Sequence, residues 1–196
     1  MDKERLDVLI AQRGLAEDRS HAQKLVMAGQ VRVGGQLIFK PDTRFPPDVD
    51  IQIDQGPRYV SRGGEKLEAA LAAFHRTDLA GIVCADVGAS TGGFTDCLLQ
   101  HGAGKVYAVD VGYGELHWKL RSDPRVVVME RTNARHLQKL PEPVSLVTID
   151  ASFISLRVLL PAAARWLPEG GGEVIALIKP QFEAERKEVS RGEGVI

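Results

Sequence analysis

The chain has 196 residues, of which 44% are hydrophobic and 26% are charged, and its formal net charge is −1. Such a composition is ordinary for a globular protein with one large domain, or with one medium and one small domain. No apolar run approaches the roughly 20 residues of a membrane-spanning helix, and no signal-peptide pattern opens the chain, so we expect a cytoplasmic protein without a membrane partner. Its two cysteines are too few for a disulfide framework, which agrees with a reducing compartment.

Residues 1–55 are expected to form a small α+β domain. The apolar spacing predicts two helices followed by three short strands, at 6–10, 19–28, 31–33, 36–39 and 51–53. Gly14 and Gly29 are placed to end the two helices, and Gly34-Gly35 suits a two-residue hairpin turn. The domain holds eight Lys or Arg residues against nine Asp or Glu residues, so its overall charge does not by itself favour a nucleic-acid partner.

The second domain is expected over 65–196, after a linker at 56–64 that contains Gly and Pro. Its first helix should run from Glu65 to about Phe74. Beyond that helix, strands are predicted at 82–86, 105–110, 126–129, 145–149 and 173–179, and helices at 92–101, 114–121, 133–139 and 153–166. Apolar strands that alternate with helices of about 10–15 residues indicate a parallel, doubly wound sheet. The fold class is therefore α/β, with a Rossmann-like second domain.

A glycine-containing loop, Asp86-Val87-Gly88-Ala89-Ser90-Thr91-Gly92-Gly93-Phe94, follows the first predicted strand and opens a helix. Glycines at this point let the backbone turn tightly and approach a ligand closely, as in the nucleotide-binding turn of open α/β sheets. Here an acid, Asp86, opens the loop, and Ser90 replaces the middle glycine of G-x-G-x-x-G. An acid repels a pyrophosphate and suits the cationic amino-acid end of S-adenosylmethionine. The loop therefore favours methyl transfer over hydride transfer.

Polar residues at the ends of the next two strands extend this candidate cofactor site. Asp110 comes about 20 residues after the glycine loop, the spacing at which an acid accepts ribose hydroxyls. Thr132 and Asn133 follow the third strand and are candidates to flank an adenine ring. All three have a plainer alternative role as helix caps. The candidate cofactor-binding residues are Asp86, Gly88, Ser90, Gly92, Gly93, Phe94, Asp110, Thr132 and Asn133.

Three further residues are candidates for catalysis. Asp150 ends the apolar strand 146–149, and Lys179 ends the apolar strand 174–178, so both should lie at the edge of the sheet where ligands bind. Lys66 lies on the helix that precedes the sheet. Taken singly, Asp150 could equally be a helix-capping acid and Lys66 a surface lysine.

Residues 4–54 resemble the S4 RNA-binding domain, on positions that include Arg5-Leu6-Asp7, Gly14-Leu15, Leu25-Val26, Gly29-Gln30-Val31-Arg32-Val33 and Lys40-Pro41. The resemblance implies that basic side chains of this domain contact the phosphates of structured RNA, with an affinity that falls as salt rises. The alternative is that they are solvated surface charges. The candidate RNA-binding residues are Arg13, Arg19, Lys24, Arg32 and Lys40.

The whole chain resembles the TlyA (hemolysin A) family, on four motifs: Arg62-Gly63-Gly64-Glu65-Lys66-Leu67, the glycine loop through Asp96, Asp150-Ala151-Ser152-Phe153-Ile154-Ser155-Leu156, and Lys179-Pro180-Gln181-Phe182-Glu183. Members combine an S4 domain with an FtsJ-like methyltransferase domain that uses S-adenosylmethionine. The resemblance implies 2′-O-methylation of a cytidine ribose in ribosomal RNA, with ribosomal RNA or ribosomal subunits as partner.

The FtsJ-like pattern implies a Lys-Asp-Lys-Glu set around the ribose hydroxyl, and Lys66, Asp150 and Lys179 match its first three members. Lys179 would act as the base, Lys66 would tune it and orient the hydroxyl, and Asp150 would hold the ammonium groups. No metal is implied. None of Glu183, Glu188 and Glu193 stands in a matching motif for the fourth member, and five strands are predicted where such enzymes have seven. We therefore expect a domain that is incomplete at its C-terminus.

Three alternative functions remain open at this stage. A non-catalytic RNA-binding protein would keep the methyltransferase fold without the reaction. A membrane-lytic protein, as the family name hemolysin suggests, is disfavoured because the sequence offers no amphipathic or spanning segment. A dehydrogenase is disfavoured by the acid in the glycine loop and by the lack of a second substrate domain.

Overall fold

The protein is described from a computed structural model, which covers residues 3–54 and 56–184. The chain divides into two compact units, Met1–Arg58 and Tyr59–Ile196. The second unit starts inside the segment that the sequence predicts to be a linker. Tyr59 is only 2% exposed, and the backbone N–H of Val60 donates to the carboxylate of Asp96 on helix α4 at 2.9 Å. Residues 59–64 thus pack as part of the second unit.

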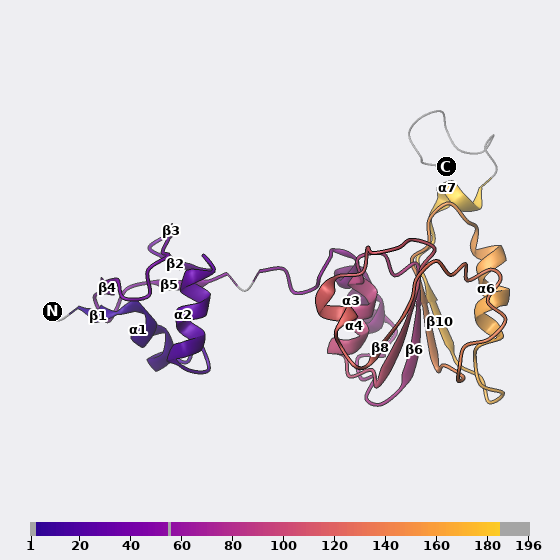
Figure 1. The fold of residues 1–196 in the computed structure, drawn as a ribbon, viewed down its shortest axis with the longest axis horizontal. Coiled ribbons are helices and arrows are strands. Elements are labelled where there is room, and N and C mark those ends of the chain that lie inside the picture. Colours follow the sequence, from indigo (N-terminus) through magenta and orange to yellow (C-terminus); the bar gives the residue numbers. More distant parts are fainter. Residues whose placement is uncertain (1–2, 55, 185–196) are drawn as a thin grey trace. The chain divides into compact units, whose positions relative to one another are not determined.

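The first unit has two helices and two small sheets (Figure 1). Its elements are β1 (Glu4–Arg5), α1 (Leu6–Gln12), α2 (Arg19–Met27), β2 (Val31–Val33), β3 (Gln36–Leu37), β4 (Arg44–Phe45) and β5 (Ile51–Ile53). β2 pairs antiparallel with both β3 and β5, and β1 pairs with β4. Gly34 and Gly35 have φ angles of 55° and 82°, as the predicted hairpin turn requires. Both helices and the hairpin are where the apolar spacing predicts them.

A buried carboxylate joins the two helices of this unit. Asp7 on α1 is 0% exposed, and it accepts hydrogen bonds from Arg5 (3.0 Å), from Arg19 on α2 (3.0 Å) and from Gln23 on α2 (2.7 Å). Burial acts to raise the pKa of Asp7, but the hydrogen bonds from Arg5, Gln23 and Arg19 outweigh it and hold the pKa well below its usual range. Asp7 is therefore ionised in the folded protein.

The second unit is a five-stranded parallel sheet between two layers of helices. Its elements are α3 (Gly63–Ala73), β6 (Val83–Val87), α4 (Gly93–Gln100), β7 (Lys105–Val109), α5 (Trp118–Arg121), β8 (Val126–Met129), β9 (Leu146–Ile149), α6 (Leu156–Ala164), β10 (Glu173–Ala176) and α7 (Pro180–Glu183). The strand order is β10-β9-β6-β7-β8. Helices α3 and α4 lie on one face of the sheet and α6 on the other (Figure 1). The predicted α/β fold is confirmed.

The helix predictions at the carboxyl side of the sheet are partly wrong. Residues 133–139 form a turn instead of a helix, because the side chain of Asn133 accepts the backbone N–H of Arg135 and draws the chain into a local turn. The helix predicted over 114–121 is reduced to α5, which His117 caps. The helix predicted over 153–166 begins only at Leu156, since Ser155 caps it and Phe153 has a φ of 64°. Strand β10 ends at Ala176.

Three glycines bring helices α3 and α4 into backbone contact. A Cβ atom on Gly93, the first residue of α4, would stand 2.8 Å from the backbone N of Gly64 and 3.1 Å from the Cα of Gly63, both on α3. Only glycine allows this approach. Since Lys66 lies one turn further along α3, the glycines also set how near Lys66 comes to the sheet.

We predict that Asp7→Asn lowers the free energy of unfolding of the first unit by about 1–3 kcal/mol at pH 7, because charged hydrogen bonds to a buried group are lost. The folded-state pKa of Asp7 lies below its unfolded value, so its contribution is present above pH ~4 and fades as the pH falls below that. Urea unfolding at pH 7 and pH 3 measures the difference in stability between the protein and Asp7→Asn, and this difference should be smaller at pH 3. The exposed control Asp48→Asn should change stability little at either pH, and an equal effect of both variants would contradict the account.

We predict that Gly93→Ala destabilises the second unit by about 1–3 kcal/mol, because the added methyl group meets backbone atoms that cannot turn away. Gly170→Ala is the matched control, since a Cβ atom there meets nothing within 4 Å. Thermal unfolding of both variants measures the effect. A Gly93→Ala protein as stable as the control would mean that α3 and α4 do not need this contact.

Candidate functional site

Two pockets open side by side at the carboxyl edge of the sheet. One has a volume of about 800 Å³ and lies between the start of α3, the glycine loop and the loop after β9. The other, of about 650 Å³, lies between the ends of β6 and β7 and the loop after β8. Both are lined by Gly88, Ser90, Asp150 and Ser152, so the two spaces meet at the ends of β6 and β9. Their sizes are those of small-molecule sites.

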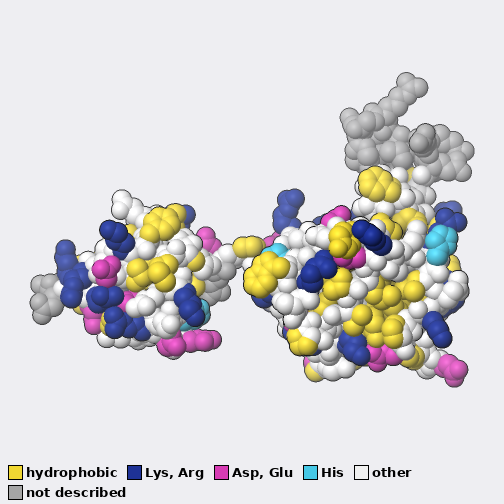
Figure 2. All heavy atoms as spheres, in the orientation of Figure 1, with side chains coloured by type: hydrophobic (Ala, Val, Ile, Leu, Met, Phe, Trp, Pro, Cys, Tyr) yellow, Lys and Arg dark blue, Asp and Glu magenta, His cyan; other side chains and the backbone are white. Residues whose placement is uncertain are grey.

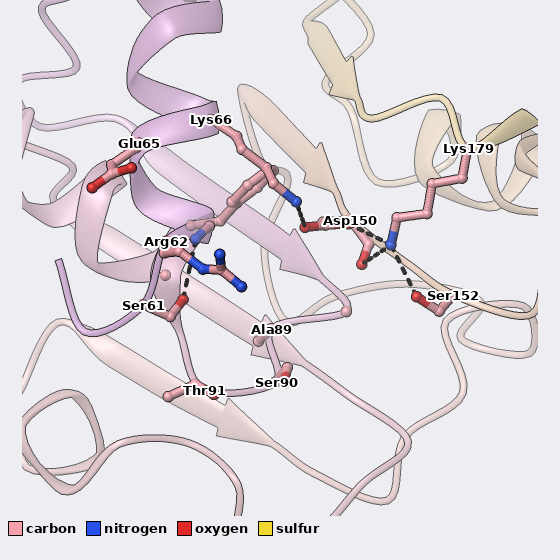
Figure 3. Close-up of a pocket in the computed structure, with 14 residues that line it drawn as sticks. Ser61, Arg62, Glu65, Lys66, Ala89, Ser90, Thr91, Asp150, Ser152 and Lys179 are labelled. Carbon is pink, nitrogen blue, oxygen red and sulfur yellow. Dashed lines mark hydrogen bonds and ion pairs between the residues drawn. The ribbon is translucent and has the colours of Figure 1, made fainter.

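The first pocket holds both lysines and the aspartate that the sequence singles out (Figure 3). The Nζ atom of Lys179 lies 2.6 Å from Oδ1 of Asp150 and donates a hydrogen bond to the Ser152 hydroxyl at 2.9 Å. The Nζ atom of Lys66 lies 3.9 Å from Oδ2 of the same carboxylate. Lys179 and Asp150 are each 19% exposed in their side chains, whereas Lys66 is 53% exposed. The structure thus brings the three candidates together around one carboxylate.

The second pocket is built around Asp110. One of its carboxylate oxygens accepts the backbone N–H of Ser90 at 2.8 Å, and the other accepts that of Gly112 at 2.7 Å. Each carboxylate oxygen has a second lone pair, which can accept a further hydrogen bond. Apolar side chains of Val111, Ile154 and Leu159 also line this pocket. The combination of a fixed acid and apolar walls suits a ligand with hydroxyl groups and a flat ring.

The glycine loop turns tightly, and its backbone is strained at Ser90. Ser90 has a φ of 47°, and its hydroxyl donates to Glu115 at 3.2 Å. A Cβ atom on Gly88 would stand 2.8 Å from the backbone O of Asp150, so this glycine lets the loop pack against the chain that carries the aspartate. Ser90 occupies a region of φ that glycine adopts freely and serine rarely does. Its hydrogen bonds to Asp110 and Glu115 hold it there.

Asp86 does not have the position that the sequence predicts. It is 0% exposed and lines neither pocket, because its carboxylate points into the sheet and accepts hydrogen bonds from Thr95 (2.7 Å) and Thr148 (3.2 Å). Burial raises the pKa of Asp86 to about 6, and the nearby charge of Asp150 acts in the same direction. We correct its role from ligand contact to support of the strand end beneath the loop.

The other predicted cofactor residues divide between the pockets and the core. Gly93 and Phe94 line the first pocket, although both are buried. Gly92 is buried with a φ of 99°, and a side chain there would collide with Leu116 and Leu120, so its role is in packing. Thr132 and Asn133 line the second pocket. The alternative role of Asn133 as a cap is also present, since it accepts the N–H of Arg135.

Comparison with known proteins gives the same two parts. Residues 59–196 match the FtsJ-like methyltransferase family and residues 4–51 match the S4 domain. The chain is 46% identical over 196 residues to the 16S/23S rRNA (cytidine-2′-O)-methyltransferase TlyA of Mycobacterium tuberculosis, covering 98% of this chain and 72% of the relative. It is 45% identical over 195 residues to Hemolysin A of Brachyspira hyodysenteriae, covering 98% and 80%. The chain belongs to the TlyA (hemolysin A) family.

A solved structure supports this assignment. A protein from Streptococcus thermophilus that carries the name hemolysin is 47% identical and superposes with a TM-score of 0.66, over 99% of this chain and 71% of that one. In this TlyA-family chain, no helix of the described residues is long and apolar enough to cross a membrane. Within residues 3–54 and 56–184, no group of three His, Cys, Asp or Glu side chains could hold a metal ion.

The basic residues of the S4 unit do not all remain available to a partner. The guanidinium of Arg13 donates to the backbone carbonyls of Pro47 and Val49, Arg19 is bound to Asp7, and Arg32 donates to the carbonyl of Gly35. Lys24 and Lys40 are exposed. On the face seen in Figure 2, basic and acidic side chains are interspersed over this unit.

Several residues of the site were not predicted from the sequence. Ser61 and Arg62 line the first pocket, and in Figure 3 the Arg62 guanidinium points into it while Glu65 points away. Ser152 is hydrogen-bonded to Lys179. Arg62 and Ser152 could have been predicted, because both stand inside motifs that carry the family resemblance. Glu183 lies outside the lysine cluster and binds Ser155 and Leu156, while Glu188 and Glu193 lie outside the described residues.

We predict that Asp86→Asn changes how stability depends on pH. The folded-state pKa of Asp86 is raised to about 6, so the folded protein holds its proton more tightly than the unfolded chain does. The protein should therefore lose stability as the pH rises from about 4 to about 6, and Asp86→Asn should not show this loss. Urea midpoints across pH 4–7.5 provide the measurement, with the exposed Glu169→Gln as control. Parallel pH curves for the protein and Asp86→Asn would refute the assignment.

Proposed function

We propose that this chain is an S-adenosylmethionine-dependent RNA methyltransferase that methylates the 2′-hydroxyl of a cytidine in structured ribosomal RNA. The observation that carries the proposal is the convergence of Lys66 and Lys179 on Asp150, next to the pocket of Asp110. Support for the substrate class comes from the relative in Mycobacterium tuberculosis, which is named a 16S/23S rRNA (cytidine-2′-O)-methyltransferase. The S4 unit supports a structured RNA as the partner.

The second pocket fits the cofactor. Asp110 would accept the ribose hydroxyls of the adenosine, and Thr132 and Asn133 would flank its ring beside the apolar side chains of that pocket. Gly88 and Ser90 border both pockets, so they would lie along the part of the cofactor that faces the substrate. When bound, S-adenosylmethionine supplies a methyl group on a positively charged sulfur, which a hydroxyl oxygen attacks in line.

The two lysines and Asp150 would handle the proton of the ribose hydroxyl. This hydroxyl is a very weak acid, so the attack benefits from a base that takes its proton. In the proposal, the amine of Lys179 takes that proton, and Asp150, 2.6 Å away, holds the resulting ammonium. Lys66, on the other side of the carboxylate, would orient the hydroxyl.

The S4 unit would hold the RNA through phosphate contacts. Lys24 and Lys40 are the exposed candidates, whereas Arg13, Arg19 and Arg32 already bind groups of the protein and would have to serve two purposes. Such contacts make the affinity fall with rising salt.

Lys24→Ala should therefore weaken RNA binding and reduce its salt dependence, as measured by titration of labelled ribosomal RNA at several salt concentrations. Unchanged affinity and slope would remove Lys24 from the interface.

Methyl transfer from labelled S-adenosylmethionine to ribosomal RNA or ribosomal subunits tests the proposed function. Incorporation of label into RNA is the expected result. Binding of S-adenosylhomocysteine and RNA without any transfer would instead favour a non-catalytic RNA-binding protein with the methyltransferase fold. Calorimetry with S-adenosylhomocysteine and with NAD separates both from a dehydrogenase, since only the former ligand should bind.

We predict that Lys179→Ala abolishes transfer and leaves the affinity for S-adenosylhomocysteine within about tenfold, because Lys179 acts on the hydroxyl and not on the cofactor. Asp110→Ala should first weaken cofactor binding, measured by calorimetry. Lys139→Ala, which removes an exposed lysine away from both pockets, is the matched control for transfer. Equal loss of transfer and of cofactor affinity in Lys179→Ala would mean that its role is misassigned.

A further inference from the structure

The loops that carry Asp150 and Lys179 touch at three successive points. At the first, Lys179 contacts Asp150 and Ser152. At the second, the rings of Phe153 and Phe182 lie 5.3 Å apart with an interplanar angle of 50°. Further along both loops, Glu183 on α7 reaches the start of α6. The contacting residues follow the same order in both loops. The contact of Glu183 can therefore affect that of Lys179, because only a few residues of backbone separate the two contacts in each loop.

Glu183 makes the best-defined of these contacts. Its Oε2 atom accepts the hydroxyl of Ser155 at 2.7 Å, and its Oε1 atom accepts the backbone N–H of Leu156, the first residue of α6, also at 2.7 Å. The N–H groups of a first helical turn have no partner within the helix, and they attract a negative charge. These two hydrogen bonds hold the pKa of Glu183 below its usual range, so its carboxylate is ionised.

We propose that Glu183 is a positioning residue, which clamps the loop after β10 to the start of α6 and thereby holds Lys179 against Asp150 and Ser152. Among residues 3–54 and 56–184, the other polar and ring contacts that tie this segment to the loop 150–155 are those of the aromatic pair and of Lys179. Both oxygens of Glu183 are occupied by Ser155 and Leu156. Because both oxygens are already used, Glu183 differs from a carboxylate that binds the lysines directly. The consequence for catalysis rests on the proposed function, while the clamp itself does not.

The reactivity of the Lys179 amine tests the clamp without any methyl transfer. In the intact protein Lys179 is paired and 19% exposed in its side chain, so acetic anhydride should label it slowly compared with the exposed Lys139. Glu183→Ala should raise the labelling rate of Lys179 by roughly tenfold, since two hydrogen bonds to a charged group are lost. Mass spectrometry of peptides gives both rates in one sample. The matched control Glu169→Ala removes an exposed glutamate and should leave both rates unchanged.

Two further variants identify what holds the clamp. Glu183→Gln keeps an oxygen for the N–H of Leu156 and gains an amide that donates to Ser155, so it should label Lys179 within about twofold of the original rate. Ser155→Ala removes one contact of the clamp together with the cap of α6 and leaves α7 unchanged in sequence, so an intermediate rate is expected even if Glu183→Ala fails to fold. Labelling of Lys179 at the original rate in Glu183→Ala and Ser155→Ala would overturn the proposal. If Lys179 is labelled as fast in Glu183→Gln as in Glu183→Ala, this result would overturn the claim that hydrogen bonds hold the clamp.

Transfer kinetics then connect the clamp to the reaction. With RNA and S-adenosylmethionine saturating, Glu183→Ala should lower kcat by roughly tenfold or more and leave both KM values nearly unchanged, and Glu183→Gln should restore kcat. A rise in KM without a fall in kcat would contradict a role in placing Lys179. If the unmodified chain transfers no methyl group, the proposed function fails, whereas the labelling experiment still decides whether the clamp exists.

Discussion

The site depends on one carboxylate shared by two ammonium groups. Asp150 leaves the end of β9 and meets Lys179 on one oxygen and Lys66 on the other. The lysines come from segments more than a hundred residues apart in the sequence, and two positive charges placed this close would repel each other without the acid between them. In the proposed reaction, the same acid would hold the ammonium that forms when Lys179 takes the proton.

The parallel sheet and its buried supports keep this carboxylate in place. β9 lies between β6 and β10, so the backbone before Asp150 is hydrogen-bonded on both sides. Asp86 and Thr148 join β6 to β9 inside the sheet, and Gly88 lets the glycine loop pack against the carbonyl of Asp150. On the other side of the pocket, Gly93 lets α4 approach α3 and so places Lys66. Packing at these positions, and not the lysines themselves, determines the geometry.

Much of this arrangement could be predicted from the sequence, because it follows from strands and their ends. Asp110 and Asp150 each follow a buried apolar strand, Lys179 follows a half-buried one, and parallel strands bring their carboxyl ends to one edge. The failures have local or long-range causes. The ligand contact predicted for Asp86 is not seen because Thr95 and Thr148, the latter 62 residues away, hold its carboxylate inside the sheet. The contact between Glu183 and Ser155 also spans 28 residues and leaves no periodic signal. The turn at Asn133 replaced a helix because a side chain competed for the backbone.

We propose that the cluster of Lys66, Asp150 and Lys179 acts on a ribose hydroxyl. Digestion of ribosomal RNA to nucleosides after incubation with the protein and isotopically labelled S-adenosylmethionine, followed by mass spectrometry, tests it most directly. We predict that the label appears in 2′-O-methylcytidine and is absent when Lys179 is replaced by alanine. Label found on a nucleobase, or transfer that survives the loss of Lys179, would contradict it.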